Sequence, residues 1–381
     1  MKPDFRRKVH CVLGLPFDLL DETQAIERVR ESTRTGKPCF FSTPNLSFAT
    51  AVQRDAALRD SVLRSDMSVP DGMPLIWAAK LMGVPTRGRV AGSSMFEHLW
   101  HRPAPGAQPL KVFFFGGADG VAARASERIN ADVKGVRCVG FESPGFGSVE
   151  AMSSDELIGR INATRPDFVI VSIGVAKGQA WIERNRSRLS APVISYLGAV
   201  VNFVAGAVQR APKAFQGLGL EWLWRIKEEP ALWQRYANDG RAYLGLLFTR
   251  VIPYRWTILC HSPRNEQLKN AKAELVADGQ GHRLRIEGAW DQRNVDTLRP
   301  VLEEAVSATG HLHIDLDACD WADSETIALL TVLWAHRQVL AWTCRVSAVK
   351  PRLLRLLHGC CADYLLNPAP SSSAQSLALE K

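Results

Sequence analysis

Features that define several protein classes are missing from this sequence of 381 residues. Its eight cysteines include no Cys-x-x-Cys pair, so we expect neither a zinc framework nor structural disulfides, but reduced thiols in a cytosolic protein. The longest apolar stretch, residues 243–259, is interrupted by Arg250, Pro253 and Arg255 and is not expected to span a membrane. The short apolar stretch near the N-terminus ends at Pro16 and does not resemble a signal peptide.

Motifs of several enzyme classes are also absent. The sequence has no Gly-x-Ser-x-Gly motif for a nucleophilic serine and no P-loop. Residues 1–260 contain no Asp-x-Asp doublet of the kind that holds a metal-bound nucleotide sugar. His98 and His101 have no third metal ligand nearby in the sequence, so we expect no metal site and no metal cofactor.

What is present indicates a globular chain with more than one domain. Apolar residues make up 46% of the sequence and charged residues 23%, which argues against general disorder. The length exceeds that of one ordinary hydrophobic core. The net charge of +8 is unevenly placed, because residues 261–381 contain 13 basic and 15 acidic residues and the whole basic excess lies before them.

Strand and helix patterns alternate over residues 1–205. The expected helices cover residues 20–33, 46–62, 73–82, 121–130 and 179–188, and Asp21 is a candidate N-cap of the first. The expected strands cover residues 38–42, 111–115, 167–173 and 193–197. This alternation predicts an α/β domain with a Rossmann-like, mostly parallel sheet that has helices on both faces.

The rest of the chain divides into four expected segments. Residues 206–260 are predicted to form a helical appendage rich in arginine and tryptophan, and residues 261–281 a linker. Residues 282–366 predict a second, small α/β domain, with strands at 283–287, 311–316 and 343–346 and helices at 294–307, 325–340 and 350–357. Residues 367–381 are rich in serine and alanine and are expected to be flexible.

Residues that directly follow the predicted strands are candidates for ligand binding, because ligands of open parallel sheets bind beyond the carboxyl ends of the strands. They are Thr43, Asn45, Gly116, Gly117 and the run from Gly174 to Gln179. Glycines at such positions let backbone N–H groups approach a phosphate, and the following helix N-terminus adds a favourable dipole. Together they predict a nucleotide or nucleotide-sugar pocket, although each glycine alone could serve only a turn.

Asp71 is the one acidic residue in a Pro-Asp-Gly turn ahead of an apolar helix. Aspartate often caps a helix in this position. A carboxylate held at a rigid turn could equally act as a general base toward a hydroxyl group. The sequence leaves both roles open.

A combination of motifs in residues 10–245 resembles the WecG/TagA/CpsF glycosyltransferases. These motifs are Thr43-Pro44-Asn45, Val69-Pro70-Asp71-Gly72, Arg89-Val90-Ala91-Gly92-Ser93, Phe115-Gly116-Gly117, Arg210-Ala211-Pro212 and Gly219-Leu220-Glu221-Trp222-Leu223-Trp224-Arg225. The resemblance implies inverting, metal-independent transfer of a sugar, such as N-acetylmannosamine or glucose, from a nucleotide diphosphate to a polyprenyl-diphosphate-linked saccharide. Such reactions build bacterial surface polysaccharides and exopolysaccharides.

The resemblance also implies roles for individual residues. Asp71 would be the base and Thr43 a second active-site residue. The donor, which we expect to be UDP-linked, would be bound by Asn45, Gly92, Ser93, Gly116, Gly117, Gly174, Lys177 and Gln179. Acceptor or membrane contacts are expected from Arg210, Trp222, Trp224, Arg225, Arg241 and Arg250. Tryptophan beside arginine in amphipathic helices favours a membrane surface over nucleic acid, so we expect a peripheral protein on the inner face of the cell membrane.

Three positions depart from the family pattern. A family aspartate is Ser94, a family glutamine is Gly178 with Gln179 one place later, and another family aspartate is Asn202. We expect altered polar contacts to donor or acceptor. The alternative is a catalytically degenerate scaffold that is regulated through its C-terminal domain.

Residues 282–366 resemble a STAS domain, the small module of anti-sigma-factor antagonists and sulfate transporters. The resemblance rests on Asp315-Leu316-Asp317 and on Asp323-Ser324-Glu325-Thr326. In that family a serine at a helix N-terminus is phosphorylated and switches binding of a protein partner. Glu325 occupies the position of that serine, so Ser324 is the remaining candidate for a regulatory site, with an N-cap as its alternative role.

Overall fold

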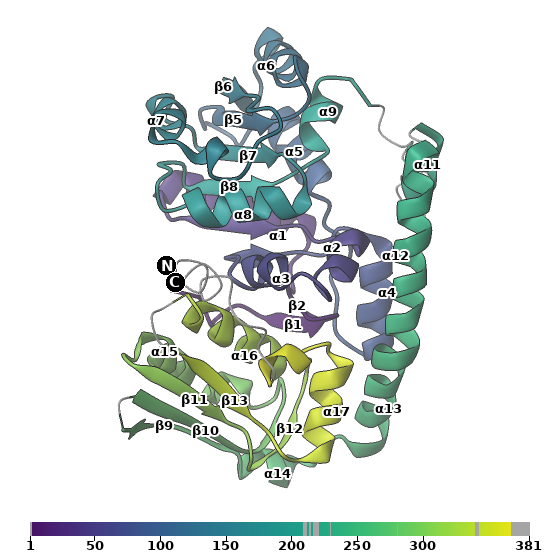
Figure 1. The fold of residues 1–381 in the computed structure, drawn as a ribbon, viewed down its shortest axis with the longest axis vertical. Helices are drawn as coiled ribbons and strands as arrows, with labels where there is room; N and C mark the ends of the chain where they lie inside the picture. The colour runs from purple at the N-terminus through teal and green to yellow at the C-terminus, as the bar shows by residue number, and fades with distance from the viewer. Residues whose placement is uncertain are drawn as a thin grey trace, which may run out of the picture.

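The computed structural model of the protein describes residues 2–208, 212, 215, 221–228, 230–279, 281–339 and 343–366. Two α/β parts of unequal size are joined along one side by a long column of helices (Figure 1). The larger part comes from the first half of the chain and the smaller part from the last third.

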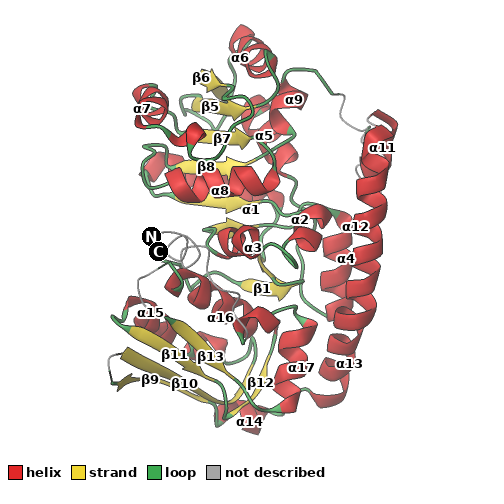
Figure 2. Cartoon of the chain, viewed as in Figure 1, coloured by secondary structure: helices red, strands yellow, loops and turns green. Residues whose placement is uncertain are grey.

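The larger part is built on a six-stranded sheet in the order β4-β3-β8-β7-β5-β6, and every neighbouring pair is parallel. Its strands are β3 (Cys39–Ser42), β4 (Met67–Ser68), β5 (Leu110–Gly116), β6 (Val136–Glu142), β7 (Phe168–Ser172) and β8 (Val193–Tyr196). Helices cover both faces of this sheet (Figure 2). The predicted Rossmann-like fold is therefore confirmed.

Two separate apolar cores hold these helices to the sheet. One core packs α1 (Glu22–Thr35), α5 (Gly92–His101), α6 (Val121–Ala131) and α9 (Val200–Val204). The other packs α7 (Asp155–Ala163) and α8 (Val175–Asn185). The central strands are buried on both faces, which is why they are near-continuous apolar runs in the sequence.

Capping residues at helix ends explain why one predicted helix is confirmed and another is wrong. Asp21 caps α1 as predicted, because its carboxylate accepts the Gln24 N–H at 2.9 Å. The predicted helix over residues 46–62 is wrong, since the chain forms α2 (Leu46–Ala51) and α3 (Ala56–Leu63) instead. Asp55 separates them by capping α3 through the Leu58 N–H at 2.9 Å.

An N-terminal hairpin has no counterpart in the predicted elements. Strands β1 (Val9–Val12) and β2 (Leu15–Asp18) pair antiparallel across a turn at Leu13 and Gly14. Both turn residues have positive φ, 52° and 83°, as a tight hairpin turn requires. Leucine is unusual at such a position, so the sequence carries no ordinary hairpin signal there.

The smaller part is a mixed five-stranded sheet with helices. Its elements are β9 (Lys272–Asp278), β10 (Gly281–Trp290), β11 (His311–Asp315), β12 (Cys319–Ala322), β13 (Cys344–Ser347), α15 (Arg299–Ser307), α16 (Ser324–Arg337) and α17 (Pro351–Gly359). Strand β10 pairs parallel with β11 and β12 and antiparallel with β9. The predicted linker over residues 261–281 contains β9 and the short α14 (Asn265–Lys269), so it is largely ordered structure.

The helical column consists of α11 (Glu221–Glu228), α12 (Trp233–Leu246), a π-helical turn (Leu247–Val251) and α13 (Ile252–His261). It runs beside α4 (Met73–Met82) and continues down to the smaller part (Figure 1). Within the described ranges, no helix combines the length and apolar character needed to cross a membrane.

Candidate active site

A pocket of about 520 Å³ lies between the ends of β3 and β4 and the helices α4 and α12. Its lining includes Asn45, Asp71, Trp77, Arg89, Ser93 and Tyr236. The volume falls within the range of small-molecule sites. Among the predicted site residues, Asn45, Asp71, Ser93 and Trp222 all line this pocket.

Asp71 is held at the pocket by a rigid turn. Its N–H donates to the Pro44 carbonyl at 2.8 Å, and the Val90 N–H donates to the Pro70 carbonyl at 3.0 Å. The carboxylate is half-buried and accepts the Gly92 N–H at 3.4 Å. Gly72, not Asp71, occupies the N-cap of α4, so the N-cap role predicted for Asp71 on this helix is wrong. The N–H that its carboxylate accepts belongs to the first residue of α5.

Thr43 and Gly92 lie directly beneath this turn. Thr43 is buried, with 8% of its surface exposed. A Cβ atom on Gly92 would sit 3.0 Å from Oγ1 of Thr43 and 2.5 Å from Cδ2 of Leu197, so only glycine allows this close approach. Asn45 caps α2, because its Oδ1 accepts the Phe48 N–H at 3.2 Å. These residues support the turn that presents Asp71.

Arg89 adds a positive charge to the pocket, although the sequence analysis assigns it no role in the site. Its Nη1 donates to Oε2 of Glu221 at 2.5 Å, which ties α11 to the larger sheet. Burial acts to lower the pKa of Arg89, but the hydrogen bond and charge of Glu221, together with the charge of Asp71, outweigh it and raise the pKa. Arg89 is therefore a fixed cation between two carboxylates.

Helix α12 closes the opposite wall. Asp239 accepts the hydroxyl hydrogens of Ser47 and Thr50, at 2.5 and 2.8 Å, and so binds α12 to α2. The Tyr243 hydroxyl donates to the Pro74 carbonyl at 2.6 Å, one turn beyond Asp71. Burial raises the pKa of Tyr243 to about 12, so the phenol keeps its proton for this bond at neutral pH.

Several predicted donor-binding residues lie along the same sheet edge but outside the pocket lining. Gly116 and Gly117, with φ of 105° and 95°, follow β5, and Gly174, with φ of 91°, precedes α8. A Cβ atom on Gly116 would meet the Ser172 carbonyl at 2.7 Å, whereas Gly174 faces open space. Gly116 is thus required by strand packing, and Gly174 leaves the N-terminus of α8 accessible.

Two other residues that were predicted to bind the donor make hydrogen bonds within the protein instead. The Lys177 ammonium donates to the Gly147 carbonyl at 2.8 Å, so it fastens the loop after β6 to α8. Gln179 is only 1% exposed, and its Oε1 accepts the Ser61 hydroxyl at 2.8 Å. In this arrangement Gln179 packs in the interior.

The three departures from the family pattern have different surroundings. A side chain at Gly178 would begin 2.5 Å from Cδ2 of Tyr196, so the tyrosine ring fills the space that a larger residue would need. Ser94 on α5 and Asn202 on α9 are half-buried. The exchange at position 178 is thus coupled to the identity of residue 196 at the end of β8.

The residues predicted to contact the acceptor or the membrane have different surroundings in the structure. Arg241 is exposed on α12, and Trp224 packs its ring against Phe215 at 5.9 Å. Arg250 instead donates to Oδ2 of Asp363 at 2.5 Å, so it joins the two parts of the molecule. Arg210 and the side chain of Arg225 lie outside the described residues.

Ser324 is buried. It is 4% exposed, and its Oγ is 3.0 Å from Nδ1 of His10 in the N-terminal hairpin. The N-cap of α16 is Asp323, whose carboxylate accepts the Thr326 N–H at 2.9 Å, so the capping role predicted for Ser324 is wrong. In this arrangement a modifying enzyme cannot reach the Ser324 hydroxyl.

Sequence reasoning missed the pocket residues that come from distant helices. Arg89 and Glu221 both belong to motifs shared with the glycosyltransferase family. Their opposite charges are the one sequence feature that could have predicted their ion pair. Trp77, Tyr236 and Tyr243 carry no such signal, because helical apolar spacing is also what a core helix shows. Over the described ranges, no cluster of three or more histidine, cysteine or acidic residues could hold a metal ion.

Open parallel α/β sheets bind their ligands beyond the carboxyl ends of the strands, and at this edge the sheet presents a carboxylate and a cation that line one pocket. The profile of the glycosyl transferase WecG/TagA/CpsF family matches residues 10–256, and the chain belongs to this family. The profile of the Mlab-type STAS domain matches residues 273–366, so the predicted fusion is confirmed and its second part begins with β9 rather than at residue 282.

Three curated relatives carry the same name, N-acetylglucosaminyldiphosphoundecaprenol N-acetyl-beta-D-mannosaminyltransferase. The protein of Bacillus spizizenii is 29% identical over 52% of this chain and 75% of its own length. That of Bacillus subtilis is 26% identical, over 54% and 78%. That of Staphylococcus aureus is 22% identical, over 56% and 82%.

Proposed function

We propose that this protein transfers a sugar from a UDP-linked donor to a polyprenyl-diphosphate-linked saccharide. The observation that carries the proposal is the Asp71 carboxylate, which lines the same pocket as the Arg89 guanidinium. The relatives' name supplies the substrate class, with N-acetylmannosamine as the first donor to test. The test is transfer from radiolabelled UDP-N-acetylmannosamine to N-acetylglucosaminyl diphosphoundecaprenol; absence of transfer from this and other UDP-sugars would favour the scaffold alternative.

In the proposed reaction Asp71 takes the proton of the acceptor hydroxyl as its oxygen attacks the anomeric carbon. The bond from that carbon to the donor diphosphate breaks, the electron pair leaves with UDP, and the configuration is inverted. Arg89 and Arg235 line the pocket and would offset the charge that grows on the departing diphosphate. Gly174, at the open N-terminus of α8, is the further candidate for a phosphate contact.

The acceptor is a lipid, and the pocket opens beside an exposed apolar surface. Five exposed apolar residues follow one another at spacings of four, four, four and three along α12, the π-helical turn and α13, namely Leu244, Phe248, Ile252, Trp256 and Leu259. This set is called the apolar stripe. Leu244 also lines the pocket, as do the exposed rings of Trp77 and Trp222. The stripe would rest on the inner leaflet and lead the polyprenyl chain to the pocket.

Replacing Phe248 and Trp256 together by glutamine is expected to weaken binding to phosphatidylglycerol-containing vesicles by about tenfold to thirtyfold. Both rings are exposed, and burying part of each in lipid is worth about 1 kcal/mol. Vesicle flotation measures the change. Phe146→Gln is the matched control, because Phe146 is fully exposed after β6, at the sheet edge opposite β4. Equal loss in the control, or no loss in the double variant, would remove the stripe from membrane binding.

Transfer is expected to continue in the presence of excess EDTA. In the proposed mechanism Arg89 and Arg235, rather than a metal ion, stabilise the negative charge of the departing diphosphate. The measurement is the initial rate before and after chelation. A rate that falls with EDTA and returns with Mg²⁺ or Mn²⁺ would contradict this part of the mechanism.

A further inference from the structure

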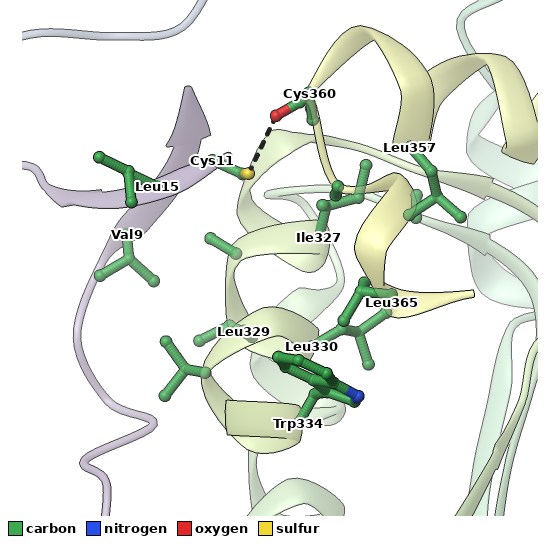
Figure 3. Packing of buried hydrophobic residues seen from close by; sticks show 14 of the residues in the cluster. Val9, Cys11, Leu15, Ile327, Leu329, Leu330, Trp334, Leu357, Cys360 and Leu365 are labelled. Carbon is green, nitrogen blue, oxygen red and sulfur yellow. Dashed lines mark hydrogen bonds between the residues drawn. The ribbon is translucent and has the colours of Figure 1, made fainter. Parts of the chain in front are cut away.

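The smaller part of the molecule is packed tightly against the larger one. Side chains of the N-terminal hairpin, including Val9, Cys11 and Leu15, share one buried apolar core with residues of α16 and α17, as Figure 3 shows. Helix α16 also contacts α3. Every side chain of α16 from Ser324 to Ala335 is buried, so this helix has no face left for another protein.

Polar contacts fix the relative position of the two parts. The Gly14 N–H donates to the Cys360 carbonyl at 2.6 Å, and the Tyr364 hydroxyl donates to the Gly14 carbonyl at 3.0 Å. The guanidinium of Arg59 on α3 lies 3.9 Å from the centroid of the Tyr364 ring. These contacts are specific in direction, unlike an apolar patch that could slide.

The same interface continues to the active-site helices. The π-helical turn and α13 contact α4 on one side and α17 on the other. Arg250 of the turn is paired with Asp363 of the smaller part at 2.5 Å, and Tyr254 of α13 is buried against α17. Helix α12, which directly precedes this turn, carries Tyr236 and Tyr243 to the pocket.

We infer that the STAS-like part binds its own glycosyltransferase part and, by holding α13 against α17, positions α12 as the wall of the acceptor pocket. Helix α16 is covered by the β1–β2 hairpin and α3 of the same chain and is therefore closed to a separate protein. The consequence for the acceptor rests on the proposed function, whereas the consequence for the mobility of α12 and α13 does not.

Gly359→Ala in the full-length chain tests this inference with one added methyl group. A Cβ atom at position 359 would lie 2.5 Å from Cβ of Tyr254, so α17 and α13 must separate. The change does not weaken α17 itself, because alanine favours a helix over glycine by about 1 kcal/mol. The matched control is Gly159→Ala on α7, where nothing lies within 4 Å of the added atom.

The readouts are hydrogen exchange of residues 243–261 and the KM values for each substrate. Gly359→Ala is expected to speed exchange in α12 and α13 by at least tenfold and to raise the KM for the lipid acceptor severalfold, with the donor KM unchanged. Gly159→Ala should change neither. Faster exchange in α17 with none in α12 and α13 would overturn the inference, as would no change anywhere.

A second variant covers the case in which Gly359→Ala fails to fold. Asp363→Arg removes the carboxylate that pairs with Arg250 at a partly exposed site and leaves only the contacts of Arg250 with His358 among those described. Asp320→Arg is its control, because the one described ion pair that it loses is with Lys350 inside the smaller part. The same shift in exchange, smaller in size, is expected for Asp363→Arg alone. If the unmodified protein transfers no sugar, the proposed function fails, while hydrogen exchange still decides the inference.

Discussion

Replacing Asp71 by asparagine is expected to slow sugar transfer by about 10²–10⁴-fold, the usual contribution of a general base. The amide cannot take the proton of the acceptor hydroxyl. It can still accept the Gly92 N–H that the carboxylate accepts at 3.4 Å, so the turn and the pocket should keep their shape. The measurement is kcat with both substrates saturating, together with the KM for the donor, which should stay within about twofold because Asp71 is assigned no donor contact.

The control for this variant is Asp132→Asn, which changes an exposed aspartate whose only described ion pair is with Lys134. Its kcat should equal that of the unmodified protein. Asp71→Glu keeps a carboxylate at a shifted position and should recover part of the rate. If Asp71→Asn turned over at the normal rate, Asp71 would have no part in proton transfer. If it lost activity together with thermal stability, its role would be in the turn.

The sequence predicts those strands whose two faces have the same surroundings. Strands β5, β7 and β8 are largely buried on both faces and therefore appear in the sequence as nearly continuous apolar runs. Strand β6 is at the sheet edge and half-exposed, so it carries no such run and was missed. The β1–β2 hairpin was missed because Leu13 adopts a positive φ that its residue type does not suggest.

Residues of the candidate site can likewise be predicted only where the signal lies in neighbouring positions of the sequence. Asp71 was found because a Pro-Asp-Gly turn is a local signal, readable from three neighbouring residues. The Arg89–Glu221 pair and the bond from Tyr243 to Pro74 join residues more than a hundred positions apart, so no local pattern encodes them. One feature of the sequence does indicate that the STAS-like part is docked. Apolar residues occur on all sides of α16, and a helix of this kind is usually buried on all sides.

Replacing Arg299 by methionine is expected to lower the free energy of unfolding by about 3–5 kcal/mol at pH 8, the usual cost of removing one partner of a buried ion pair. Arg299 is 8% exposed and pairs with Oε1 of Glu325 at 2.5 Å. It also donates to the Arg7 carbonyl at 2.9 Å and to the Phe5 carbonyl, so it joins the STAS-like part to the N-terminal segment. Urea unfolding measures the loss.

The size of this loss should depend on pH, and the sign follows from Glu325. Burial raises the pKa of Glu325 from 4.5 to about 7, and the charge of Asp323 adds to this, while Arg299 opposes it. A carboxyl whose pKa is raised on folding makes the folded state less stable as pH rises from about 4.5 to about 7. Without Arg299 the pKa of Glu325 rises further, so the decline continues above pH 7.

His10 is a second titratable group near Arg299. Burial and the charge of Arg299 lower its pKa to about 4, so the folded protein keeps His10 neutral at a cost that appears below pH 6.5. Burial, the larger cause, keeps His10 neutral at pH 6 with or without Arg299, so the pH dependence of the deficit comes mainly from Glu325. The deficit of Arg299→Met should therefore be smaller at pH 6 than at pH 8, and the double variant Arg299→Met/Glu325→Gln should lose most of this difference. Arg299 also pairs with the exposed Asp296 at 2.8 Å. Equal deficits at both pH values would therefore mean that Arg299 stabilises the interface through its other contacts and not through its ion pair with Glu325.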